Sequence, residues 1–179
     1  MKLTPSGFLM LGMVRLGVRS GYGIKKISDV STRFFWPTSL AQVYPELARL
    51  VQAGLLIRRE DPQGARERFA YELTERGEQA MDAWLRSSRE APTQFRHEGV
   101  LRLFFADALA EEDQLALVRR LRERVSDVAT HTREEILPLA EALESSGTRF
   151  PALVARLRAD TYAYVERWLE QAEAELEQT

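Results

Sequence analysis

The spacing of hydrophobic positions changes twice between residues 37 and 77, and each change predicts a new element. The first pattern repeats every three or four residues, as on one face of a helix, at Leu40, Val43, Leu47, Leu50 and Val51. Gly54 then ends the helix, and the apolar run 55–57 predicts a strand. A proline- and glycine-containing turn at 61–64 precedes residues 68–73, where apolar and polar side chains alternate. The pattern therefore predicts a helix followed by a β-hairpin.

Two more helices are predicted upstream of this region. Thr4 and Ser20 are favourable N-cap residues, and they predict helices over 5–16 and 22–31. The inner face of the second helix is expected to hold Ile24, Ile27 and Val30. An aromatic linker, 34–37, follows and is expected to fill the space between the second and third helices.

Pro45 lies inside the hydrophobic stripe of the third helix. Either Thr38 or Ser39 can cap a helix that runs through Pro45 with a kink, or the helix begins at Pro45 itself. We expect the kinked helix, because the stripe crosses Pro45 without a change of phase. A continuous helix leaves the Ala41 carbonyl without its usual N–H partner.

The elements predicted after the hairpin are all helical. A helix over 74–89 is expected to point four residues inward, namely Ala80, Met81, Trp84 and Leu85. Pro92 marks a domain boundary, and helices over 93–108, 111–145 and 151–178 follow it. The stripe of the 111–145 helix changes phase before it continues at Ile136, Leu139 and Leu143, and Pro138 is expected to kink it. The last helix has a long apolar stripe formed by Leu153, Leu157, Tyr164, Trp168, Ala172 and Leu176.

The order of elements is that of a winged helix-turn-helix followed by a helical domain. The predicted fold is mainly α, with a winged helix domain and its two-stranded β wing at 1–91 and an α-helical dimerisation and effector domain at 92–179. Two or three amphipathic helices cannot easily bury all their apolar faces within the second domain. A second copy of the chain would cover them, so a homodimer formed through 92–179 and the first helix is expected.

Composition narrows the function classes. The chain has 179 residues, 45% of them hydrophobic, without cysteine and without an apolar run of the roughly 18 residues that a membrane span needs. The N-terminal stretch holds Arg15 and lacks a cleavage motif, so we do not expect a signal peptide. The expected location is the cytoplasm. The net charge of −2 hides an asymmetry: residues 1–90 have 14 basic and 10 acidic side chains, whereas 91–179 have 11 and 17. A basic front half suits a polyanion such as DNA.

Four sequence motifs resemble the PadR-like transcriptional regulators over about residues 3–85. They are Gly21-Tyr22-Gly23-Ile24-Lys25-Lys26, Val43-Tyr44-Pro45-Glu46-Leu47, Gly54-Leu55-Leu56 and Leu73-Thr74-Glu75-Arg76-Gly77. The tail resembles the virulence-activator type of C-terminal domain found in the long subfamily. The resemblance implies a homodimeric DNA-binding repressor, often released by a small molecule, with a Tyr-Pro inside the recognition helix. The chain departs from the family at Ala41, where glycine is frequent, and in the wing, where Phe69-Ala70 replace a basic residue.

The predicted DNA contacts lie in the second helix, the third helix and the wing. The candidate residues are Tyr22, Lys25, Lys26, Thr38, Ser39, Gln42, Tyr44, Arg66 and Arg68. Gln42 can bond adenine bidentately, whereas lysine and arginine suit phosphates. Each residue also has a structural interpretation: the charged ones can be solvated surface groups, and Tyr44 can be a core anchor.

A small aromatic or hydrophobic effector is the third expected partner, besides operator DNA and a second copy. Its candidate site is lined by Phe8, Phe104, Phe105, Tyr162, Tyr164 and Trp168, which can equally be packing residues. Arg102 or Arg158 could pair with an anionic effector. His97 and His131 lack metal-ligand spacing, and no nucleophile–base pattern or phosphate-cradling loop occurs, so neither a metal, a cofactor nor an enzyme is expected.

We therefore expect a sequence-specific transcriptional regulator, a repressor that acts as a homodimer and is released by an effector. One alternative is a constitutive regulator whose aromatic residues only pack. The other is a winged-helix protein-interaction adapter without specific DNA binding, which the acidic second half would suit.

Overall fold

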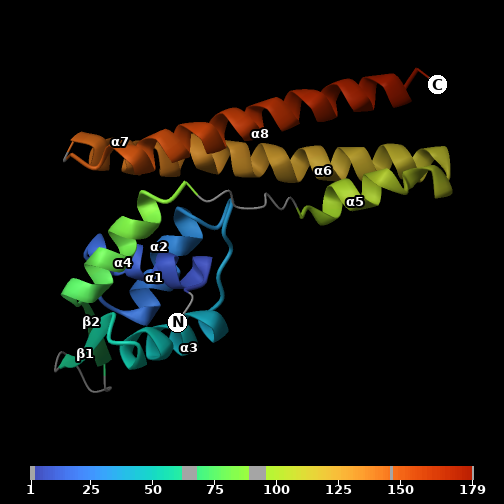
Figure 1. The fold of residues 1–179 in the computed structure, drawn as a ribbon. Helices are drawn as coiled ribbons and strands as arrows, with labels where there is room; N and C mark the ends of the chain where they lie inside the picture. The colour runs from blue at the N-terminus through green and yellow to red at the C-terminus, as the bar shows by residue number, and fades with distance from the viewer. Residues whose placement is uncertain (1–2, 62–67, 89–95, 146, 179) are drawn as a thin grey trace. The chain divides into compact units, whose positions relative to one another are not determined.

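The chain folds into two compact units, Met1–Ala91 and Pro92–Thr179. The structure, a computed structural model shown in Figure 1, describes residues 3–61, 68–88, 96–145 and 147–178. In this described part, no helix has the length and apolar character needed to cross a membrane.

The first unit is a helical domain with one small sheet. Its elements are α1 (Pro5–Arg15), α2 (Gly21–Val30), α3 (Leu40–Gln52), β1 (Leu56–Asp61), β2 (Arg68–Leu73) and α4 (Glu75–Leu85). The two strands are antiparallel, with Leu56 opposite Leu73 and Asp61 opposite Arg68. This is the winged-helix order of elements, so the predicted fold class is confirmed. The predicted turn at 61–64 lies outside the described residues from its second position onward.

Three of the helices in this unit start in the same way. The hydroxyls of Thr4, Ser20 and Thr74 each accept a hydrogen bond from the backbone N–H three residues later, at 3.1, 3.0 and 3.0 Å. Such caps satisfy N–H groups that have no partner inside the helix. The residue that donates is glycine each time, at positions 7, 23 and 77.

One hydrophobic core holds this unit together. It draws buried side chains from every helix and from both strands: Met10, Leu11, Met13, Val14, Ile24, Val43, Leu47, Leu50, Leu55, Leu56, Tyr71 and Met81. The backbone N–H of Tyr71 also donates to the carbonyl of Arg19 at 2.8 Å, which ties β2 to the segment between α1 and α2. The sheet is therefore anchored on its core side by packing and by this bond.

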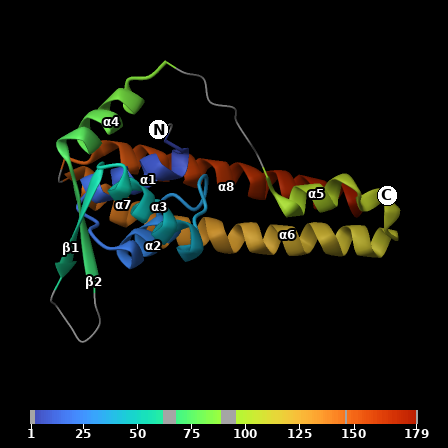
Figure 2. The same cartoon turned by 60° about the horizontal axis from the view of Figure 1, so that its bottom comes forward.

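The second unit is a long helical hairpin. Its elements are α5 (Glu98–Phe104), the 3₁₀ turn η1 (Ala106–Ala108), α6 (Glu111–His131), the π-helical turn η2 (Thr132–Ile136), α7 (Leu137–Ser145) and α8 (Arg149–Leu176). Figures 1 and 2 both show α8 alongside α6 and α7. The pairing is antiparallel, because Arg119 near the start of α6 contacts Glu173 near the end of α8.

The π-helical turn explains the phase change in the sequence. The backbone N–H of Leu137 donates to the carbonyl of Thr132, five residues back. Pro138, which follows, has no N–H to continue the helical pattern. The extra residue in the turn rotates the helix, so that Ile136 and Ala140 pack against α8. The other members of the predicted stripe, Leu139 and Leu143, are exposed and do not share this packed face.

Other predicted inner faces also need correction. Ile27 and Val30 of α2 are 40% and 37% exposed, because the buried side of that helix is formed by Gly21, Ile24 and Ser28. Trp84 and Leu85 of α4 are exposed as well. The helix predicted over 93–108 is much shorter, since α5 ends at Phe104 and a 3₁₀ turn follows.

Candidate nucleic-acid interface

Helix α3 is continuous through Pro45, as expected, and the alternative start at Pro45 is wrong. Its buried side consists of Val43, Leu47 and Leu50, while Pro45 lies on the exposed side. The proline therefore removes one hydrogen bond without disturbing the packed face. The exposed residues of its first turns are Leu40, Ala41, Gln42, Tyr44 and Pro45. In helix-turn-helix proteins this end of the second helix faces the DNA.

Gln42 closes the N-terminus of α3. Its Oε1 accepts hydrogen bonds from the backbone N–H of Ser39 at 3.0 Å and from the Ser39 hydroxyl at 3.2 Å. This is the glutamine half of a capping box, whose signature Ser-x-x-Gln is present at 39–42. The signature could have revealed the role from the sequence alone. Both residues are exposed, so the cap itself lies on the surface that α3 offers.

Tyr44 packs on α2 with one side of its ring and is exposed on the other. Its ring packs on the backbone of α2, because a Cβ added at Gly21 would lie 2.6 Å from the Tyr44 Cε1. The side chain is nevertheless 49% exposed. Tyr44 thus joins α2 to α3 while half of it remains available at the surface. Tyr22, one residue after Gly21, is 66% exposed.

The two lysines of α2 differ in exposure and in ion pairing. Lys25 is half-buried and forms an ion pair with Asp29 one turn later. Lys26 is exposed, and no ion pair involving it occurs among the described residues. Of the two predicted phosphate contacts, Lys26 is therefore the unpaired one.

An open hollow of about 290 Å³ lies where α2 approaches the start of α3. It is lined by Lys25, Asp29, Arg33, Pro37, Thr38 and Ser39. Arg33 was not predicted from the sequence, because this residue falls in the segment between the two helices and follows no periodic pattern. The structure places its exposed side chain beside two of the predicted contacts, Thr38 and Ser39.

The wing carries charge on both of its strands. Arg66 lies outside the described residues, and Arg68 is the first residue of β2, opposite Asp61. On β1, the Arg58 guanidinium lies 4.2 Å from the centre of the Phe69 ring, and Arg59 forms an ion pair with Glu72 at 2.8 Å. The hydrogen bond from Arg59 lowers the pKa of Glu72. Arg58 was not among the wing residues predicted from the sequence, although its position in the hairpin could have indicated it.

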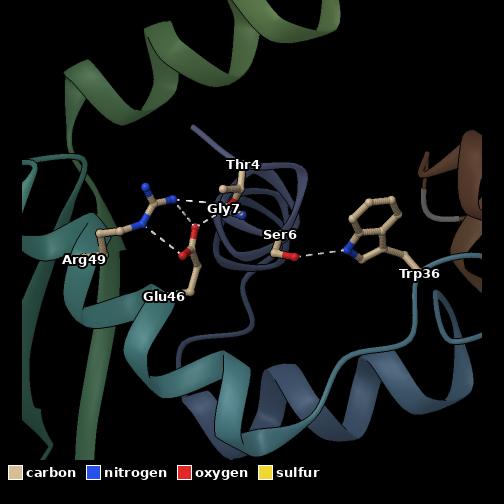
Figure 3. A network of polar contacts seen from close by, with 6 residues as sticks. All are labelled: Thr4, Ser6, Gly7, Trp36, Glu46 and Arg49. Atoms are coloured by element: carbon tan, nitrogen blue, oxygen red, sulfur yellow. Dashed lines mark hydrogen bonds and ion pairs between the residues drawn. The ribbon is translucent and has the colours of Figure 1, made fainter. Parts of the chain in front are cut away.

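A polar network fixes α3 against α1 (Figure 3). The Thr4 hydroxyl, already the cap of α1, donates to Glu46 Oε1 at 2.9 Å, and Arg49 Nε donates to Glu46 Oε2 at 3.0 Å. The hydrogen bond to Glu46 raises the pKa of Arg49. Trp36 Nε1 also donates to the Ser6 hydroxyl at 3.3 Å, so that the segment before α3 is tied to the same helix. These contacts attach α3, through Glu46, and the segment before it, through Trp36, to α1.

The six aromatic candidates for an effector site come from both units. Phe8 belongs to the first unit and stacks on Trp84, with ring centres 4.6 Å apart. Phe104 and Phe105 meet edge to face at 5.1 Å and are both exposed. On α8, Tyr162 packs into the core and lies 5.8 Å from the buried Arg158 guanidinium, whereas Tyr164 and Trp168 are exposed. The group as a lining set stays a prediction.

The described residues contain no group of three or more histidine, aspartate or glutamate side chains placed to hold a metal ion. His97 instead caps α5, where its Nδ1 accepts the backbone N–H of Val100 at 3.1 Å. His131 pairs with Glu135 on the surface of α6 and η2. Both histidines thus have structural partners.

Comparison with known proteins finds similarity to transcriptional regulators. Residues 10–83 match the family described as "Transcriptional regulator PadR-like family". The "Negative transcriptional regulator PadR" of Bacillus subtilis (strain 168) is 28% identical over 148 residues, covering 80% of this chain and 81% of that protein. The fold resembles Bacillus subtilis PadR solved with operator DNA, with a TM-score of 0.83, 24% identity and coverage of 97% and 99%.

Two further structures share the fold. The PadR-like transcriptional regulator BC1756 from Bacillus cereus has a TM-score of 0.80 at 18% identity, covering 96% of this chain and 98% of that one. Bacillus subtilis PadR in complex with p-coumaric acid has a TM-score of 0.76 at 23% identity, with the same coverage. The fold likeness therefore spans both units and not only the matched residues 10–83.

Proposed function

The chain carries a domain of the PadR-like family of transcriptional regulators at residues 10–83, and from this premise we propose that it binds an operator as a homodimer, represses transcription and is released by a small molecule. The observation that carries the proposal is the exposed, capped N-terminal end of α3, with cations of α2 beside it. In helix-turn-helix proteins this end of the recognition helix enters the major groove. The relative solved with operator DNA has the same fold.

The contacts divide into two classes by chemistry. Gln42 and Ser39 sit at the start of α3, where a side chain can reach base edges. Lys26 and Arg33 are exposed cations on and after α2, which suits phosphate oxygens. Tyr22, Lys25, Thr38 and Tyr44 complete the proposed surface of the helix-turn-helix, and Arg66 and Arg68 that of the wing. The first class provides sequence preference, and the second provides affinity that falls with salt.

Dimer formation is supported by the outer faces of the second unit. The side of α8 that faces α6 and α7 is built from small or medium side chains, such as Ala152, Ala155 and Leu169. The long apolar stripe predicted for this helix is exposed, except for Ala172, which packs against the core. Its large exposed members are Leu157, Tyr164 and Trp168. Other large apolar side chains exposed on this unit are Leu101, Phe104, Phe105, Leu139 and Phe150. So much exposed apolar surface on one small unit is typical of a protein–protein interface, and a second copy of the chain is the partner we propose.

Release by an effector is supported by the relative solved with p-coumaric acid. We propose a small aromatic or hydrophobic ligand for this chain and keep the six aromatic candidates as its contacts. A ligand that binds only the folded protein raises the unfolding temperature. A thermal-shift screen with aromatic acids and aromatic cations therefore tests this part separately. If the protein is a constitutive regulator, none of these compounds should raise its unfolding temperature.

Genomic selection tests the proposed function directly. The purified full chain is mixed with sheared DNA from its own genome, and the bound fragments are sequenced. We expect a few fragments that share a pseudopalindromic site, with half-sites about one helical turn apart or a multiple. The protein-interaction adapter predicts recovery without enrichment, which would overturn the proposal. An analytical ultracentrifugation run on the same sample tests the dimer.

A further inference from the structure

The side-chain amide of Gln42 is already used on one side. Its Oε1 accepts two hydrogen bonds, from the backbone N–H of Ser39 at 3.0 Å and from the Ser39 hydroxyl at 3.2 Å. An amide oxygen has two lone pairs, so these two donors fill its capacity. The amide cannot be turned round, because the backbone N–H of Ser39 can only donate and would then face another donor. The oxygen therefore points at Ser39 for a chemical reason.

The nitrogen of the same amide is left for a partner. Nε2 carries two N–H donors, and within the described residues it makes no hydrogen bond. The Gln42 side chain is exposed at the end of α3 that the proposed function places in the major groove. What Gln42 presents there is a pair of donors and no acceptor.

The cap has a reason to persist when DNA binds. At α1, α2 and α4 the capping hydroxyl accepts a backbone N–H of the first turn. At α3 the capping box adds bonds in the other direction, from Ser39 to the side chain of Gln42. A Gln42 that turned its oxygen to a base would give up both bonds from Ser39. Base recognition through Nε2 alone leaves both intact.

We propose that Gln42 recognises guanine rather than adenine, donating through Nε2 while Oε1 stays bonded to Ser39. Guanine is the base that shows two acceptors, O6 and N7, on its major-groove edge. Adenine pairs one acceptor with the N6 donor, and bidentate bonding to adenine needs the amide oxygen that Ser39 occupies. This replaces the adenine contact expected from the residue type alone. The proposal rests on the DNA-binding function proposed above and specifies its base preference.

The variants for the test separate the cap from the base contact. Gln42→Glu keeps an acceptor for the Ser39 N–H, since Ser-x-x-Glu is also a capping box, but it has no donor. Gln42→Met removes both without adding charge. Gln52→Glu makes the same amide-to-carboxylate change at the exposed last residue of α3 and serves as the matched control. Thermal unfolding should show that Gln42→Glu is as stable as the unaltered protein.

The experiment selects binding sites from a random duplex library with the unaltered chain and the three variants. We expect one guanine per half-site whose enrichment disappears in Gln42→Glu and Gln42→Met but remains in Gln52→Glu. Replacing that guanine by 7-deazaguanine, which lacks the N7 acceptor, should weaken binding by the unaltered chain about fivefold or more. The same replacement should leave Gln42→Met almost unaffected.

Three outcomes would overturn the inference, and they differ in meaning. If the position that relaxes in the Gln42 variants is adenine in the unaltered protein, Oε1 leaves Ser39 on binding. If no position relaxes, Gln42 does not contact a base. If the unaltered protein enriches no sequence at all, the proposed function itself fails, and the base preference fails with it.

Discussion

The Tyr44 ring of α3 lies directly on the backbone of Gly21 at the start of α2. A Cβ at Gly21 would lie 2.6 Å from Cε1 of this ring, and its three nearest atoms all belong to Tyr44. The absence of a side chain at Gly21 therefore sets how closely the two helices of the helix-turn-helix approach each other. The half-exposed Tyr44 ring therefore sets the distance between α2 and α3, the two helices that we propose to contact DNA.

Substitution of Gly21 should consequently act through Tyr44. We expect Gly21→Ala to lower the free energy of unfolding by about 1–3 kcal/mol, the usual cost of overpacking, and to weaken DNA binding. In a Tyr44→Ala background the same change should cost little, because the conflicting atoms are gone. Urea unfolding of the four proteins of this double-mutant cycle measures the coupling. Equal effects in both backgrounds would show that the ring is not the obstacle.

Two other glycines of the first unit form a matched pair for stability. At Gly77 a Cβ would lie 2.2 Å from the backbone carbonyl oxygen of Leu55, whereas at Gly12 it would meet only the Met81 Cε, at 3.2 Å. A methionine tip can move, but a carbonyl in the chain cannot. We expect Gly77→Ala to lose about 3 kcal/mol or more, and Gly12→Ala to be close to neutral. Thermal unfolding of both variants checks this, and a larger loss for Gly12→Ala would contradict it.

Removal of Asp29 should strengthen binding to any DNA. Asp29 neutralises Lys25 in an ion pair and lines the hollow beside Thr38 and Ser39. Asp29→Asn deletes one negative charge from the proposed phosphate-binding surface and releases Lys25. We expect higher affinity for operator and random duplexes alike, with a steeper dependence on salt. Fluorescence anisotropy titrations at several salt concentrations measure both quantities, and an unchanged affinity for random DNA would be against a phosphate role for Lys25.

Stability should fall in acid through a bridge between α1 and α4. The hydrogen bond from Arg15 lowers the pKa of Asp82. The charged carboxylate therefore stabilises the folded state above its unfolded pKa of about 3.9, and this contribution is lost as the pH falls through the lower folded pKa. We expect the unfolding temperature of Asp82→Asn to lie below that of the unaltered chain at neutral pH, and the gap to close as the pH falls below about 4. A gap that persists in strong acid would mean that Asp82 acts by packing alone.

Local signals in the sequence were sufficient for three helix starts of the first unit and for the two strands. Thr4, Ser20 and Thr74 cap helices with partners three residues away, so nothing distant is needed to predict them. The phase change before Ile136 was also visible in the sequence. That a π-helical turn produces it was not predicted. The faces of α2 and α4 were predicted less well, because the partner that covers a stripe is set by tertiary packing.

The candidate site was also predicted only in part, because some of its features depend on contacts between elements. Gln42 was chosen for its chemistry, while its bond to Ser39 decides which half of the amide is free. Arg33 entered the site only through the space between α2 and α3. Residue type gives the chemistry that a side chain can perform, and neighbours determine which part of that chemistry remains.

The most direct test of the central claim is a titration of the purified full chain against the operator recovered by genomic selection, beside random duplex DNA of equal length, over a series of salt concentrations. The account predicts tight operator binding whose logarithm falls linearly with the logarithm of salt, and a slope smaller by about one for Lys26→Ala. It also predicts much weaker binding to the random duplex throughout. Equal affinity for the two duplexes at every salt concentration would contradict sequence-specific regulation by this protein.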